Sequence, residues 1–162
     1  MTFSYDEVRD FLHREARYLD EKQWDLWLEL YCADVEYWAP AWDDDGETTT
    51  DPQRELSLIY YPNRGGLEDR VFRIRTGKSA ASTPAPRTGH NLANIEILEN
   101  GEQACTVQFN WITCSQRYQQ VDQYFGTTTC QLVRQGGGLR IQKKKVLLKS
   151  DYIRHVVDIY HL

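Results

Sequence analysis

The sequence has no long hydrophobic run. Its apolar stretches, such as Val146-Leu147-Leu148, are far shorter than the roughly 20 residues that a helix needs to cross a bilayer. The opening residues also lack the basic and apolar segments of a secretory signal. We therefore expect no membrane partner and predict a cytoplasmic protein.

An excess of positive charge is also missing. The 162 residues contain 19 Lys and Arg against 24 Asp and Glu, which gives a formal net charge of −5. This is the wrong sign for binding a phosphate backbone, so nucleic acid is not an expected partner. The length is that of one domain, and residues 1–162 are expected to form it alone.

Metal-binding spacings are scarce as well. The four cysteines show neither C-x-x-C nor C-x-H spacing, and in a reducing compartment they are expected to be free thiols. His155, Asp158 and His161 contain the two-His, one-carboxylate set of non-haem iron. On a strand, a spacing of three sends them to alternating faces, so no metal site is predicted there.

Aromatic residues, in contrast, are abundant. They make up 12% of the chain, with 5 Trp and 10 Tyr, which is more than a small core needs and is typical of subunit contacts. Trp38, Trp42, Tyr60 and Tyr61 lie in and beside irregular segments. We predict these four as anchors of an interface.

The first third of the chain has helical periodicity. Ser4 and Glu7 match a capping box, which predicts a helix from Tyr5 to about Asp20, and a second short helix follows over residues 24–31.

Residues 31–76 alternate between strand and helix signals. Residues 35–39 predict a short strand at a sheet edge or ending at Pro40. Asp51-Pro52 predicts the start of a third helix that includes Tyr60. Residues 67–74 fit a helix better than a strand, although periodicity alone leaves both open.

The rest of the chain has the period of two that strands show. Residues 93–97, 105–113, 118–134 and 139–148 predict strands, joined by hairpin turns at Asn100-Gly101 and at residues 136–138. Ala93, Ile95 and Ile97 are expected on one face of the first of these strands. Helices followed by an antiparallel meander predict an α+β fold, with helices covering one face of a curved sheet.

Two polar features could carry chemistry. His90 would act as a general base if Asp34 or Asp122 supplied a carboxylate partner, but a histidine bonded to loop carbonyls is the commoner case. The run Lys143-Lys144-Lys145 alternates between the two faces of a strand, which is more typical of a solvated face than of one basic patch.

Four stretches carry a resemblance to a known family. They are WLELY at 27–31, GLEDRVFRI at 66–74, PRTGHNLANI at 86–95 and the ending KSDYIRHVVDIYHL at 149–162. Together they resemble the small (β) subunit of aromatic ring-hydroxylating dioxygenases, and the first and last are similar to the benzoate/toluate branch. The resemblance covers nearly the whole chain.

The resemblance implies an NTF2-like (cystatin-like) cone with a mixed, mostly antiparallel sheet. It also implies a structural, non-redox β subunit without catalytic, cofactor-binding or metal-binding residues. The partner α subunit would carry a Rieske [2Fe-2S] cluster and mononuclear Fe(II), with electrons from NADH through a reductase. The expected assembly is an α3β3 hexamer on a trimer of β chains, which cis-dihydroxylates benzoate-type acids in aromatic-compound catabolism.

Two alternatives stay open from the sequence. One is a stand-alone NTF2-like lyase or isomerase that uses His90 with an acidic partner, and the other is a non-catalytic ligand-binding cone. Within the main interpretation, benzoate, a methylbenzoate, a halobenzoate and anthranilate are all possible substrates.

Overall fold

The computed structural model describes residues 2–77, 82–151, 153 and 156–162. The helices are α1 (Tyr5–Asp20), α2 (Trp24–Glu29), α3 (Gly65–Thr76) and the short 3-10 helix η1 (Ile159–His161). The strands are β1 (Tyr31–Pro40), β2 (Ser57–Tyr61), β3 (Arg87–Asn100), β4 (Ala104–Arg117), β5 (Gln120–Gln135) and β6 (Gly138–Leu148). None of the helices in this part of the chain combines the length and apolarity that a bilayer crossing demands.

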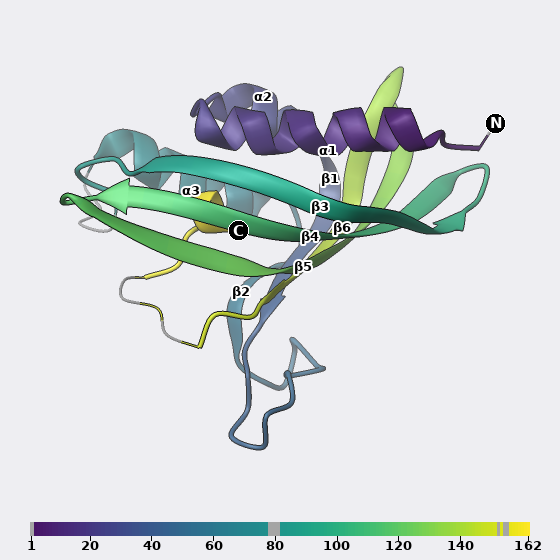
Figure 1. The fold of residues 1–162 in the computed structure, drawn as a ribbon. Helices are drawn as coiled ribbons and strands as arrows, with labels where there is room; N and C mark the ends of the chain where they lie inside the picture. Colours follow the sequence, from purple (N-terminus) through teal and green to yellow (C-terminus); the bar gives the residue numbers. More distant parts are fainter. Residues whose placement is uncertain (1, 78–81, 152, 154–155) are drawn as a thin grey trace.

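The strands form one curved, mixed sheet in the order β2-β1-β6-β5-β4-β3. Neighbouring strands are antiparallel except for β1 and β6, which are parallel. Helices α1 and α2 lie on one side of the sheet, and α1 runs along β3, whereas β2 and the loop between β1 and β2 extend away from the helices (Figure 1). This confirms the predicted α+β class with helices on one face.

Helix α1 begins and ends where the sequence predicts. The Ser4 hydroxyl accepts the N–H of Glu7 at 3.2 Å, which satisfies one of the free N–H groups at the helix start. The second half of the predicted capping box is absent, because the Glu7 carboxylate instead pairs with Arg134 of β5 at 2.6 Å. The apolar stripe of α1 is buried against the inner face of the sheet.

The inner face of the sheet supplies the other half of the core. On β4, as the period of two in residues 105–113 predicts, alternate residues share one buried face: Cys105, Val107, Phe109, Trp111 and Thr113. Burial of a large apolar side chain stabilises by about 1.5–3 kcal/mol, so this stripe and α1 hold the layers together.

The prediction of a third helix that starts at Asp51 is wrong. Asp51 does start a turn, in which its carboxylate accepts the N–H of Gln53 at 2.9 Å, but this turn ends by residue 55. The residues that follow form β2, whose Ile59 lies opposite Ala39 of β1. Strand β1 is consequently not an edge strand, although Pro40 does end it as predicted.

Irregularities in the sheet change two other predictions. Asn94 has a positive φ of 53°, and the register with β4 shifts between Ala93 and Glu96. Ala93 is exposed for this reason, while Ile95 and Ile97 pack on the core. The turn after Asn100 has three residues, 101–103, instead of the predicted two.

Candidate functional site

His90 lies at the end of α1, not beside either predicted acid. Its Nδ1 is 2.6 Å from Oδ1 of Asp20, and its Nε2 is 3.2 Å from the main-chain oxygen of Leu162. Asp34 is exposed on β1, and Asp122 lies on β5 opposite Ser115. The predicted partners Asp34 and Asp122 are therefore wrong, and the true partner was hidden because only the packing of α1 on β3 brings it near.

Asp20 fastens the start of β3 to the end of α1. Besides the ring of His90, its carboxylate accepts the main-chain N–H of His90 and the hydroxyl of Thr88, both at 2.9 Å. Burial acts to raise the pKa of the Asp20 carboxyl, but the hydrogen bonds from His90 outweigh it and hold that pKa below its usual value. The ionised carboxylate thus acts as a structural clamp.

The His90 ring has little freedom to act as a base. Its side chain is 3% exposed, although a groove of about 310 Å³ opens beside it between α1 and β3, also lined by His13 and Arg17. Both ring nitrogens already face protein oxygen atoms. A general base needs a nitrogen within hydrogen-bond reach of the substrate, and this arrangement leaves neither one pointing into the groove.

A buried ion pair lies between α1 and β6, inside the cone. The ammonium of Lys144 is 2.9 Å from Oε1 of Glu15, and both side chains are under 10% exposed. The same oxygen accepts hydrogen bonds from Nε1 of Trp27 and from the hydroxyl of Tyr31, each at 2.8 Å. Three donors thus converge on one carboxylate oxygen.

The two charges of this cluster neutralise each other, and its hydrogen-bond donors share one acceptor. Burial acts to raise the pKa of Glu15, but the Lys144 charge and the three hydrogen bonds hold it below its usual value. Burial acts to lower the pKa of Lys144, and the Glu15 charge instead raises it above its usual value. Both groups are therefore ionised at neutral pH and are committed to each other, so neither is free for proton transfer.

The structure partly corrects the interpretation of the lysine run. Its members do alternate between faces, as predicted, and Lys143 and Lys145 are exposed. Lys144 is buried instead of solvated, because it lies on the inner face of β6 with Val146 and Leu148. The sequence did not show that a counter-charge is present, since the partner Glu15 lies on another element, α1.

The candidate iron ligands serve other roles where the structure describes them. The Asp158 carboxylate caps η1 by accepting the N–H of Ile159 at 2.7 Å, and Arg70 lies 3.5 Å from it. His161 stacks on Tyr124 with ring centres 4.5 Å apart. His155 lies outside the described residues, among which no group of three or more His, Cys, Asp or Glu is placed to hold a metal ion.

The cysteines are free thiols, as predicted. Burial raises the pKa of the Cys130 thiol to about 12, and it raises the pKa of Cys32 and Cys105 as well. Since the thiolate is the nucleophile and the metal ligand, these three side chains behave as small hydrophobic residues.

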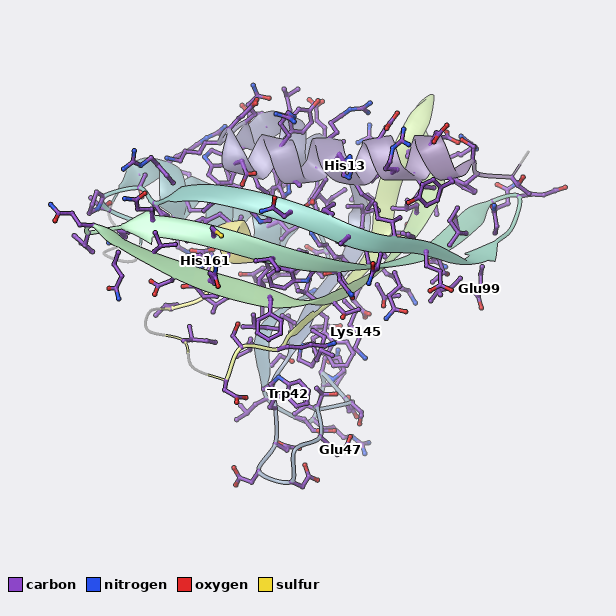
Figure 2. All side chains as sticks on the ribbon, in the orientation of Figure 1. His13, Trp42, Glu47, Glu99, Lys145 and His161 are labelled. Carbon is purple, nitrogen blue, oxygen red and sulfur yellow. The ribbon has the colours of Figure 1, made fainter. Side chains whose placement is uncertain are left out.

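The predicted aromatic anchors differ in exposure. Trp38 is only 9% exposed, and its Nε1 donates to the hydroxyl of Ser57, which leaves it little surface for contact. Trp42 is 47% exposed and lies in the loop between β1 and β2, which extends away from the helices (Figure 2). Tyr60 and Tyr61 are half-buried on β2. Their role in an interface stays a prediction.

Comparison with known proteins identifies a family whose members this chain resembles. The model of the family described as "Ring hydroxylating beta subunit" matches residues 14–155. The subunit beta of toluate 1,2-dioxygenase from Pseudomonas putida is 55% identical over 162 residues, which are all of both chains. The subunit beta of benzoate 1,2-dioxygenase from Acinetobacter baylyi is 49% identical over 99% of this chain and 95% of the relative.

A solved structure agrees with these relatives. The beta subunit of the benzoate 1,2-dioxygenase from Burkholderia mallei superposes with a TM-score of 0.85 and 46% identity. The match covers 100% of this chain and 99% of that one. The NTF2-like cone implied by the resemblance is confirmed.

Proposed function

The chain belongs to the ring hydroxylating beta subunit family, and we propose that it is the β subunit of an aromatic-ring 1,2-dioxygenase that acts on benzoate-type acids. One observation carries this proposal: the chain matches the β subunits of toluate and benzoate dioxygenases from end to end, in sequence and in fold. The complete enzyme would be an oxidoreductase that cis-dihydroxylates the aromatic ring.

In this proposal the redox groups belong to the α partner. The described residues of this chain do not fit a Rieske cluster or a mononuclear iron, because their acidic, His and Cys side chains do not converge on one point. Cys105 and Cys130 are instead packed in the core. The α subunit would hold the [2Fe-2S] cluster and the Fe(II), with electrons from NADH through a reductase.

We further propose an assembly of three α and three β chains in the cytoplasm, with residues 1–162 as one domain. The single sheet and the continuous core that joins it to α1, α2 and η1 support one domain. A structural role for this chain is supported by its interior chemistry. Glu15 and Lys144 neutralise each other, and His90 is occupied by Asp20 and Leu162.

The alternative of a stand-alone lyase or isomerase has no such support. Its proposed base, His90, is enclosed, and the family and the named relatives are dioxygenase β subunits. The ligand-binding cone likewise finds no support, because Trp27, Tyr31 and Tyr37 fill the interior.

The test is reconstitution. The chain is purified alone and also co-expressed with a Rieske-type α subunit of the benzoate branch, and both samples receive the reductase and NADH. We expect dihydroxylation of benzoate, a methylbenzoate, a halobenzoate or anthranilate only with the complex, which should contain α and β in equal amounts. Turnover of a substrate by this chain alone, or failure to bind the α chain, would contradict the proposal.

A further inference from the structure

Residues 158–162, which include η1, fill the space between α3 and the inner face of the sheet (Figure 1). All five side chains are buried. Toward α3, the Asp158 carboxylate faces the guanidinium of Arg70, and toward the sheet, the ring of His161 stacks on Tyr124 of β5 with ring centres 4.5 Å apart. The segment thus places a carboxylate and a flat ring in contact with a cation and an aromatic surface.

The polar contacts that hold segment 158–162 in place are long. The Asp158 carboxylate is 3.5 Å from Nε of Arg70, and the hydroxyls of Tyr160 and Ser82 are 3.3 Å apart. A charge-assisted bond between a guanidinium and a carboxylate is normally about 2.7–2.9 Å long. Burial raises the pKa of Asp158 in spite of the Arg70 charge, so this pair compensates the desolvation of the carboxylate only in part.

Segment 158–162 can leave its place without breaking the sheet. Helix η1 has three residues, and the described residues between it and β6 belong to no helix or strand. The main-chain N–H groups of His161 and Leu162 donate to Asp158 and Ile159, which belong to the same segment. Release therefore costs mainly apolar burial, and it is a local opening instead of global unfolding.

Two buried hydroxyls near the segment have no hydrogen-bond partner among the described residues. They belong to Tyr37 and Thr113, both 0% exposed. Thr113 lies opposite Tyr124 in the pairing of β4 with β5. The Tyr37 ring is 6.3 Å from that of Tyr61, whose hydroxyl accepts a hydrogen bond from Arg70 at 3.3 Å. Buried polar groups are nearly always bonded, so these two hydroxyls indicate a polar ligand atom that the segment does not supply.

We propose that the space filled by residues 158–162 is a binding site for a monocyclic aromatic carboxylate, and that the segment occupies it when the ligand is absent. The ligand carboxylate would replace that of Asp158 beside Arg70, and its ring would replace that of His161 on Tyr124. A free carboxylate can approach the guanidinium in the bidentate geometry that the tethered Asp158 does not reach. It would also accept hydrogen bonds from the two hydroxyls without partners.

The ligand has to displace the segment to enter. The hollow beside Tyr160 measures about 20 Å³, which is room for one water molecule and not for a ring. The deeper interior stays filled by Trp27, Tyr31 and Tyr37. The affinity of the unmodified chain is therefore reduced by the small fraction of molecules in which the segment has left, and weaker docking of the segment should raise that affinity.

The first experiment measures displacement directly. Hydrogen exchange of the unmodified chain and of Asp158→Asn is followed by mass spectrometry with and without benzoate. Benzoate should speed the exchange of residues 159–162 at least twofold while leaving the strands unchanged, and benzamide, which lacks the charge, should not. Exchange in this segment that benzoate leaves unchanged in both chains, or slows, would overturn the proposal.

The second experiment measures affinity by titration calorimetry with benzoate. Asp158→Asn keeps an oxygen that can cap η1 but removes the counter-charge of Arg70, so its dissociation constant should be at least tenfold lower than that of the unmodified chain. Asp25→Asn is the matched control, because Asp25 pairs at 2.9 Å with Arg75, another arginine of α3. Circular dichroism checks that both variants are folded. Equal affinity of Asp158→Asn and Asp25→Asn would contradict the proposal.

The third experiment tests contact with the ligand. Tyr37→Phe, added to Asp158→Asn, removes a hydroxyl that has no partner among the described residues of the unmodified chain. The dissociation constant for benzoate should rise about fivefold, which corresponds to one neutral hydrogen bond, while the urea midpoint should not fall. An unchanged dissociation constant would refute the placement of the ligand beside Tyr37.

These outcomes are independent of the proposed function, because the site lies in this chain and takes part in no reaction. A chain that forms an active complex with its α partner, but whose segment 158–162 ignores benzoate, refutes the inference alone. A chain that opens for benzoate but never binds an α subunit refutes the proposed function alone.

Discussion

Replacement of Lys144 by Met should destabilise the chain strongly, because it leaves the Glu15 carboxylate buried without a counter-charge. Met has nearly the length and volume of the lysine stem, so packing changes little. The carboxylate keeps two neutral donors, Trp27 and Tyr31. The measured effect should therefore report mainly the loss of charge pairing.

The magnitude follows from the geometry of the pair. At 2.9 Å and an effective dielectric constant of about 20, the attraction between the Lys144 ammonium and the Glu15 carboxylate is about 6 kcal/mol. Desolvation of both ions offsets much of this in the unmodified chain. When only one partner is removed, the unpaired charge stays buried, and the measured cost of such changes is about 3–5 kcal/mol.

The pH dependence distinguishes this mechanism from a simple packing defect. In the unmodified chain the pKa of Glu15 is lowered, so its stabilising contribution is present above the unfolded pKa of about 4.3 and is lost as the pH falls below it. In Lys144→Met, burial dominates and the pKa of Glu15 should rise above that value. The variant then regains stability as the pH falls from neutrality, and the difference between the two chains narrows.

Urea unfolding followed by circular dichroism at pH 7.5, 6.5 and 5.5, at one protein concentration, measures this difference. Lys22→Met is the matched control for an exposed lysine and should change the free energy of unfolding by less than about 0.5 kcal/mol. The double variant Glu15→Gln/Lys144→Met should be more stable at pH 7.5 than Lys144→Met. A loss below about 1 kcal/mol in Lys144→Met, or a difference that does not narrow with falling pH, would refute the reasoning.

Three further substitutions test other parts of the structure. Tyr37→Phe should leave the free energy of unfolding unchanged or raise it, because the Tyr37 hydroxyl is buried without a hydrogen-bond partner among the described residues; a loss above about 1 kcal/mol in urea unfolding would argue against this. Asp20→Asn should cost about 1–3 kcal/mol by weakening the clamp on His90, yet dioxygenase activity per assembled complex should not change. Gly126→Ala should cost more than about 2 kcal/mol, because its Cβ would overlap the carbonyl oxygen of Leu147, and a Tm close to that of the unmodified chain would contradict this overlap.

Local sequence patterns predicted the elements that depend on contacts between residues close together in the sequence. The cap at Ser4 placed the start of α1 correctly, and the alternation from Cys105 to Thr113 identified the buried face of β4. Prediction failed at residues 57–61, because pairing with β1 stabilises a strand there after a helix-like turn. That pairing is a long-range contact, and the local sequence of Asp51-Pro52 does not encode it.

The candidate site shows more clearly that contacts between residues far apart in the sequence could not be predicted. His90 was identified from the sequence, but its partner Asp20 is 70 residues away and the predicted acids were wrong. Lys144 was assigned to a solvated face, because its partner Glu15 is 129 residues away on α1 and local periodicity does not reveal it. Each error concerns a polar side chain whose environment is created only when α1 packs on the sheet.

The pairing of the buried charges Glu15 and Lys144 also predicts how substitutions should act in a complete enzyme. A change at Glu15 or Lys144 should alter the free energy of unfolding, and hence the amount of folded chain. A change at Asp20 should act in the same way, because it weakens the contact between α1 and β3. If both sets act in this way, the rate per assembled complex should be the same in all of them, and only the quantity of complex should differ. A variant of this chain that changed the rate per complex would instead place one of its side chains beside the α subunit's chemistry.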